Sequence, residues 1–169
     1  MADFDATTVS VETMTRTAAL RYAGGGAFTR ADLVFLGVDH GHSSYEVRVF
    51  LNNPAAHAGT ARTEAEGYAG RFHVFGHGGC FGDVGHCDVP PPSTDPTDLR
   101  PAHQLTPMST YLTVTAPLNR LLAGGAALET VTMLAITLPP RLADRAPTLD
   151  LFRFASVDLR TYHTPETPS

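Results

Sequence analysis

A glycine-rich stretch between residues 73 and 88 holds the densest group of side chains that could bind a metal. Three histidines, two cysteines and two aspartates are separated by five glycines: His73, His77, Cys80, Asp83, His86, Cys87 and Asp88. Glycine adopts unusual turns without steric cost, so such a loop lets several side chains converge on one ion. Imidazole together with thiolate suits zinc or Cu(I), and imidazole alone suits zinc or Cu(II). The stretch therefore predicts a copper or zinc site formed by a subset of these histidines and cysteines.

A second histidine pair, His40 and His42, flanks a glycine just ahead of a predicted strand. In an extended segment, residues two apart point to the same side, so both rings could face one ion. Sequential strands usually pair, which predicts that residues 38–50 lie beside residues 71–80. Histidines of the glycine-rich stretch would then complete a site of three or four ligands, although the pair also fits an ordinary turn. The remaining histidines, His57, His103 and His163, lie in polar segments and are expected to be solvated.

The two cysteines also fit a purely structural role. Cys80 and Cys87 are seven residues apart and could close a hairpin disulfide, which would contribute about 2–3 kcal/mol to stability. A cytosolic chain would normally keep them reduced. Cysteines bonded to each other cannot both bind a metal, so the two interpretations exclude one another. Asp83 and Asp88 are likewise either acid–base groups beside a metal or ordinary turn-forming residues.

The elements that must position these side chains are mostly strands. Thr, Val and aromatic residues alternate with polar ones, and Gly and Pro interrupt the chain, as is typical of strands joined by turns. The predicted strands cover residues 7–12, 31–38, 44–52, 71–76, 108–115, 130–138 and 149–159. In two of them the alternation selects a face for the core, formed by Tyr45, Val47, Val49, Leu51, Phe72 and Val74.

Helical patterns are short. Pro117 at the first turn and Gly124 after the last predict a helix over residues 117–123 that caps one end of the fold. A less regular pattern predicts a second helix over residues 14–22. Residues 90–107, rich in proline and aspartate, are expected to form a long loop. The fold class that follows is all-β, an antiparallel β-sandwich or jelly roll with one short helix.

Length and charge limit the functions that the chain can have. A chain of 169 residues fits one domain, here residues 1–160, followed by a polar tail over residues 161–169. All 12 basic residues are arginines and 17 residues are acidic, so neither nucleic acids nor anionic membranes are expected partners. No apolar run reaches the ~18 residues of a membrane span, and the acidic start lacks signal-peptide features. We therefore expect a cytoplasmic protein, and a homo-oligomer is compatible with this composition.

Several segments, in a fixed order, resemble one family. The sequence Ser-Tyr-Glu-Val at residues 44–47 resembles the signature strand in the C-terminal domain of tyrosinases and plant polyphenol oxidases. Residues 68–72, Tyr-Ala-Gly-Arg-Phe, are similar to that family's aromatic-Ala-Gly-x-Phe strand. A strand, a short helix and a strand then follow at residues 111–116, 118–122 and 131–139. The resemblance covers residues 31–140, and a related sandwich closes the functional units of molluscan haemocyanin.

The resemblance implies both a partner and an absence. Type-3 copper enzymes bind two coppers through six histidines on a helical bundle, and this sequence predicts no long helix that could carry them. In the family, the C-terminal sandwich covers the copper site and inserts a blocking side chain, but no position here matches that residue. The resemblance thus implies a free-standing sandwich that acts beside a separate tyrosinase-type catalytic chain.

Three functions remain open at this point. The first is an accessory protein that shields, stabilises or supplies copper to a tyrosinase-type oxidase. The second is a small copper- or zinc-dependent oxidoreductase that acts on a small aromatic molecule in an apolar pocket. The third is a structural or oligomerisation module with a Cys80–Cys87 disulfide and no metal.

Overall fold

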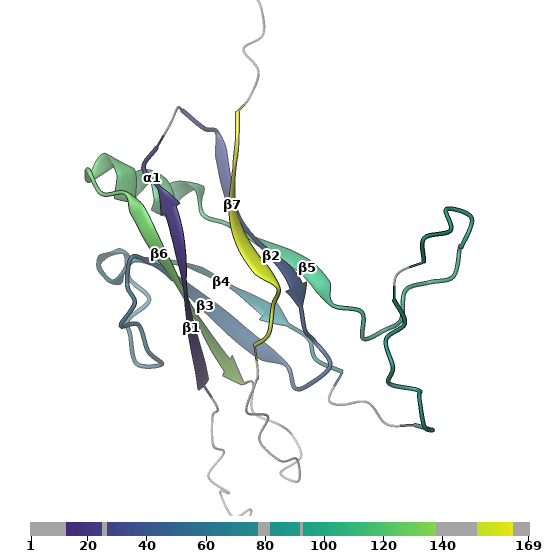
Figure 1. The fold of residues 1–169 in the computed structure, drawn as a ribbon. Coiled ribbons are helices and arrows are strands. Elements are labelled where there is room, and N and C mark those ends of the chain that lie inside the picture. The colour runs from purple at the N-terminus through teal and green to yellow at the C-terminus, as the bar shows by residue number, and fades with distance from the viewer. Residues whose placement is uncertain (1–12, 25–26, 78–81, 92, 138–151, 164–169) are drawn as a thin grey trace, which may run out of the picture.

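Two antiparallel sheets lie face to face in the computed structural model, which describes residues 13–24, 27–77, 82–91, 93–137 and 152–163 (Figure 1). One sheet has four strands in the order β1-β6-β3-β4, and the other has three in the order β5-β2-β7. The strands are β1 (Thr13–Tyr22), β2 (Arg30–Val38), β3 (Tyr45–Leu51), β4 (Tyr68–Val74), β5 (Met108–Thr113), β6 (Leu128–Thr137) and β7 (Ser156–Tyr162). The predicted fold class, an all-β sandwich with one short helix, is confirmed.

The predicted core face is confirmed as well. Tyr45, Val47, Val49 and Leu51 alternate along β3 and are all buried against the opposite sheet. The neighbouring strand β4 pairs with β3 in an antiparallel register that sets Val47 opposite Phe72. Because side chains alternate across a strand, the polar residues between these positions must lie on the outer face of the four-stranded sheet.

Aromatic rings fill the space between the two sheets. Phe35 of β2 is fully buried, and its ring centroid lies 4.9 Å from that of Phe72. Phe152 and Phe154 approach the same ring at 6.4 Å and 6.1 Å, so one cluster joins both sheets. This cluster is the centre of the core.

The prediction of a helix over residues 14–22 is wrong, because this segment forms strand β1. Thr13, Thr15 and Thr17 are exposed, and the apolar residues that pack on the core are Met14, Ala18, Leu20 and Tyr22. This period of two, with β-branched threonines on the outer face, suits a strand that pairs with β6 along its length. The strand expected over residues 7–12 lies outside the described residues.

Two other predicted elements are found with shifted bounds. The strand expected over residues 149–159 begins only at Ser156, and the residues just before it pack on the core through Phe152. Helix α1 (Thr115–Ala123) confirms the helix predicted over residues 117–123. It buries Leu118 and lies at one end of the sandwich (Figure 1). Within the described residues, no helix has the length and hydropathy needed to cross a membrane.

A long segment between β4 and β5 projects from the sandwich (Figure 1). We call its described part, residues 82–91 and 93–107, the arm. No strand or helix falls within these residues, as expected for the loop predicted over residues 90–107. Tight local turns shape the arm, for example the backbone hydrogen bond from His86 to Asp83. Its residue Val84 is fully exposed, and Leu99 is 92% exposed.

Candidate binding sites

A buried carboxylate organises the outer face of the four-stranded sheet. Glu46 of β3 is only 7% exposed, and three arginines and one histidine surround it. Arg48 and Arg71 donate hydrogen bonds to its two oxygens at 2.6 Å and 2.7 Å. Arg62 approaches to 3.9 Å and His73 to 3.3 Å. The predicted metal ligand His73 therefore lies beside a carboxylate that already accepts hydrogen bonds from two arginines.

This arginine cluster ties a covering loop to the sheet. Arg48 donates a hydrogen bond to the carbonyl of Ala58, and Arg62 comes from the same loop, residues 52–67. Burial raises the pKa of Glu46, but hydrogen bonds and the charges of Arg48 and Arg71 outweigh burial and hold this pKa below its ordinary value. Glu46 thus stays ionised and links sheet and loop.

The structure brings together His40 and His77 from the two predicted histidine groups. Their ring centroids lie 5.2 Å apart, and the backbone N–H of His77 donates to the carbonyl of His40 at 3.0 Å. Gly76 allows this approach, because an added Cβ would lie 1.9 Å from the carbonyl oxygen of His42. Strand β4 ends at Val74, so His73 and His77 do not share a strand face.

The turn that carries His40 is held from several sides. The Nε2 atom of His40 lies 2.9 Å from the carbonyl oxygen of Thr106, at the base of the arm. Asp39 accepts a hydrogen bond from the N–H of Gly41 and pairs with Arg153. Burial raises the pKa of Asp39, yet these partners and the nearby charge of His42 lower it overall. His40 therefore sits on a fixed turn.

The remaining predicted site residues lie in the arm or outside the described residues. His86, Asp83 and Asp88 are exposed in the arm, and His103 contacts the carbonyl of His86 at 3.1 Å. Cys87 is disulfide-bonded, so its sulfur is not a free thiolate, and Cys80 lies outside the described residues. Within the described part of the chain, no three His, Cys, Asp or Glu side chains gather where a metal ion could bind.

A groove that the sequence patterns did not indicate crosses the outer face of the three-stranded sheet. It has a volume of about 360 Å³, and we call it the tyrosine–arginine groove. Its lining includes Arg30, Asp32, Ser109, Tyr111, Arg160 and Tyr162. The guanidinium carbon of Arg30, on the central strand, lies 5.3 Å from the ring centroid of Tyr111 and 5.7 Å from that of Tyr162. The cation of Arg30 thus lies between two aromatic rings, and the three side chains come from three adjacent strands.

Asp32 fixes the position of that cation. Its side chain is almost fully buried, and it accepts hydrogen bonds from Arg30 at 3.0 Å and from the Thr113 hydroxyl at 2.8 Å. Burial raises the pKa of Asp32, but these two hydrogen bonds and the charge of Arg30 lower it overall. The carboxylate of Asp32 is buried, so the charged groups that the groove presents to solvent are the guanidinium groups of Arg30 and Arg160.

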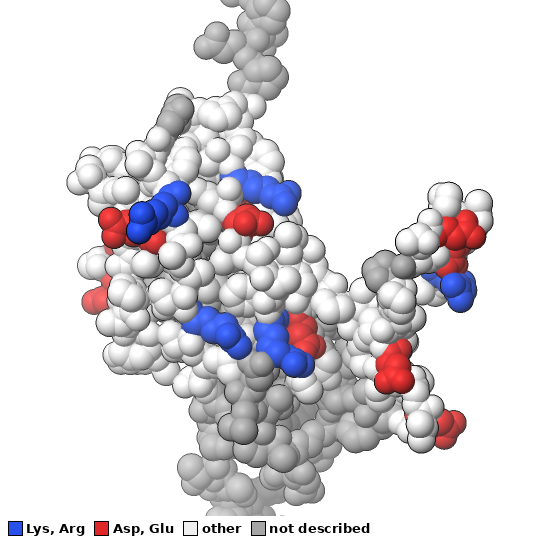
Figure 2. All heavy atoms as spheres, viewed as in Figure 1, with Lys and Arg blue, Asp and Glu red and all other residues white. Residues whose placement is uncertain are grey.

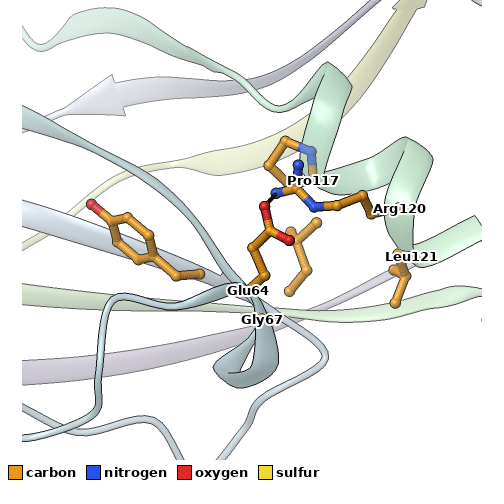
Figure 3. Close-up of a pocket in the computed structure, with 7 residues that line it drawn as sticks. Glu64, Gly67, Pro117, Arg120 and Leu121 are labelled. Carbon is orange, nitrogen blue, oxygen red and sulfur yellow. Dashed lines mark ion pairs between the residues drawn. The ribbon is translucent and has the colours of Figure 1, made fainter.

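A second hollow lies between α1 and the start of β4 (Figure 3). Its volume is about 270 Å³, and its lining consists of Leu51, Glu64, Gly67, Tyr68, Pro117, Arg120 and Leu121. Glu64 and Arg120 face each other and form an ion pair at 3.3 Å (Figure 3). Because this pair neutralises its own charges, the lining of the hollow has no net charge that would attract an ionic ligand.

No family model matches this chain, and no curated protein and no solved structure matches it either. The resemblance to tyrosinase C-terminal domains therefore stays a prediction.

Proposed function

We propose that this chain is an accessory module that docks through its arm on a separate catalytic chain, of the tyrosinase type that the sequence resemblance implies. One observation carries the proposal: the arm projects from the sandwich and presents large apolar side chains to water. Val84 and Leu99 are almost fully exposed, and Phe75 before the arm is 78% exposed. Apolar surface that is contiguous is typical of interaction sites, and the proposal takes these three side chains as parts of one such surface in the complex.

The charges of the arm describe the partner surface. Four aspartates and one arginine lie between residues 82 and 107, and Figure 2 shows the carboxylates on the arm. Arg100 is held by Asp98 through two hydrogen bonds, at 2.9 Å and 2.7 Å, so the other carboxylates set the charge. A partner that fits would have an apolar pocket with a basic rim. The order β5-α1-β6 is compatible with the strand-helix-strand order of the family.

Placing charges at the tips of the arm should weaken this docking. We expect the double change Val84→Asp and Leu99→Asp to lower the affinity for a tyrosinase-type catalytic chain without its own sandwich by about tenfold or more. Each Val or Leu side chain that is fully buried contributes about 1.5 kcal/mol or more to binding. Isothermal titration calorimetry with the two purified chains measures this.

Ala19→Asp is the matched control, because Ala19 is an exposed apolar residue on β1, away from the arm. It should leave the affinity unchanged. Equal binding by the arm variant and the original chain would overturn docking through the arm, and no binding by either would overturn the accessory function.

A copper-handling role is a second candidate, favoured by the His40–His77 pair. Two imidazoles are fewer than the three or four donors of a resident copper or zinc site, and no third donor joins them within the described residues. Two donors are too few for a resident copper ion. The pair would instead bind copper transiently, as cargo that it passes on. One backbone hydrogen bond, from the N–H of His77 to the carbonyl of His40, joins the two segments and would keep the pair ready for an ion.

His77→Ala tests the copper-handling role. We expect this variant to lose the Cu(II) that the original protein retains after incubation and desalting, because one of two donors is removed. His77 is exposed, so the fold should survive. His57→Ala, at an exposed histidine in another loop, is the control, and elemental analysis is the measurement. Equal copper content in all three proteins would exclude the His40–His77 pair as the copper-binding site.

A further inference from the structure

The tyrosine–arginine groove has the features of a built ligand site. The cation of Arg30 is oriented before a ligand binds, because its Nε atom donates a hydrogen bond to the carboxylate of Asp32. Asp32 is itself buried in the sheet, with only 3% of the residue exposed. A group held in this way loses little conformational freedom when a ligand arrives. The guanidinium of Arg30 lies over the rings of Tyr111 and Tyr162 and lines the groove.

The two tyrosines supply flat contact area on either side of the cation. Tyr111 is 59% exposed and Tyr162 is 44% exposed, although both are large aromatic residues on regular strands. Tyrosine combines an apolar ring face with a hydroxyl that forms hydrogen bonds, which suits a ligand with both kinds of surface. Ser109 adds a further hydroxyl to the lining. A sugar ring presents the same combination, an apolar C–H face and a rim of hydroxyl groups.

The positive charges of the groove indicate the class of ligand that it binds. Arg160 lies on β7 directly opposite Asp32 of β2 in the strand register, and it forms no ion pair with a carboxylate in the described part of the chain. With Arg30 it gives the groove two guanidinium groups, and guanidinium binds carboxylate through paired hydrogen bonds. Aromatic faces, hydroxyls and two cations together match a sugar chain that carries carboxylates.

We propose that the tyrosine–arginine groove binds an acidic oligosaccharide, with uronate carboxylates on Arg30 and Arg160 and sugar rings stacked on Tyr111 and Tyr162. The groove runs across three strands and about 360 Å³, near the lower end of the range for small-molecule sites, so it fits a short stretch of such a chain. This site is separate from the arm and does not depend on the proposed docking.

Three probes of equal length distinguish the ligand classes: tetragalacturonate, neutral maltotetraose and tetraglutamate. Calorimetric titration at low salt should show binding of tetragalacturonate at least tenfold tighter than binding of the other two. Tyr111→Ala and Arg160→Gln should each weaken that binding about tenfold, because each removes one full contact with the ligand. Both residues are exposed, so neither change should affect folding.

Arg21→Gln is the charge-matched control, since Arg21 is an exposed arginine on β1 of the other sheet. It should bind tetragalacturonate as the original protein does. Equal affinity for tetraglutamate would overturn the sugar assignment, and equal affinity for maltotetraose would overturn the role of the arginines. Absence of tetragalacturonate binding, or equal weakening by Arg21→Gln, would overturn the site.

Discussion

Replacing Phe35 with alanine should lower the free energy of unfolding by about 3–5 kcal/mol, the largest effect that we expect from a single change. Phe35 is fully buried, and its ring contacts Phe72, Phe152 and Phe154. Its loss leaves a cavity where the two sheets meet, and neighbouring rings can fill it only in part. The melting temperature should fall by about 10 °C for a chain of this size.

Phe75→Ala is the matched control, because the same side chain is removed from a position that is 78% exposed. Its effect on stability should stay within about 0.5 kcal/mol. Urea unfolding followed by circular dichroism measures both variants. Similar losses in the two would contradict the placement of Phe35 at the centre of the core.

A single methyl group at residue 76 should be almost as damaging. The Cβ of Gly76→Ala would lie 1.9 Å from the carbonyl oxygen of His42 and 2.6 Å from the carbonyl carbon of Ser43. Both atoms belong to the backbone, so the strand end and the turn must separate, at a cost of about 3 kcal/mol. The hydrogen bond between His77 and His40 should be lost together with the contact of their rings.

Urea unfolding gives the loss of stability in Gly76→Ala, and proton NMR shows whether the two imidazole rings stay in contact. Gly124→Ala serves as the control, since Gly124 has a φ of −74° and its nearest neighbour would lie 3.4 Å from the new Cβ. It should cost no stability. A Gly76→Ala protein with unchanged stability and ring contact would show that the turn does not pack as described.

The part of the fold that could be predicted is the part where apolar and polar residues alternate along a strand. In β3 the alternation of Tyr45, Val47, Val49 and Leu51 identified the core face and placed the strand within one residue, although Glu46 and Phe50 on its other face are buried as well. Helix α1 was predictable from the proline and glycine at its ends. Strand β1 was not, because Met14, Ala18 and Leu20 are also good helix formers, and pairing with β6 decided between the two structures.

The sites show where sequence patterns are least informative. The approach of His40 to His77 was expected from the pairing of neighbouring strands. His73 does not join them, because β4 ends at Val74, before His77. The tyrosine–arginine groove could not be predicted, since Tyr111 and Tyr162 are far apart in the chain. Only the strand order, with β2 between β5 and β7, places both rings beside Arg30. Knowledge of that order would have revealed it.

The shared carboxylate of the arginine cluster makes the covering loop responsive to acid. Because the pKa of Glu46 is lower in the folded protein than its ordinary value of 4.5, the tether is fully formed above that pH. As pH falls through the lower, folded pKa, the carboxylate gains a proton and its attraction for the surrounding arginines disappears. Arg62 would then no longer be attracted to Glu46, which removes one of the links between residues 52–67 and the sheet. The apolar core between the sheets has no part in this titration and keeps the sandwich closed.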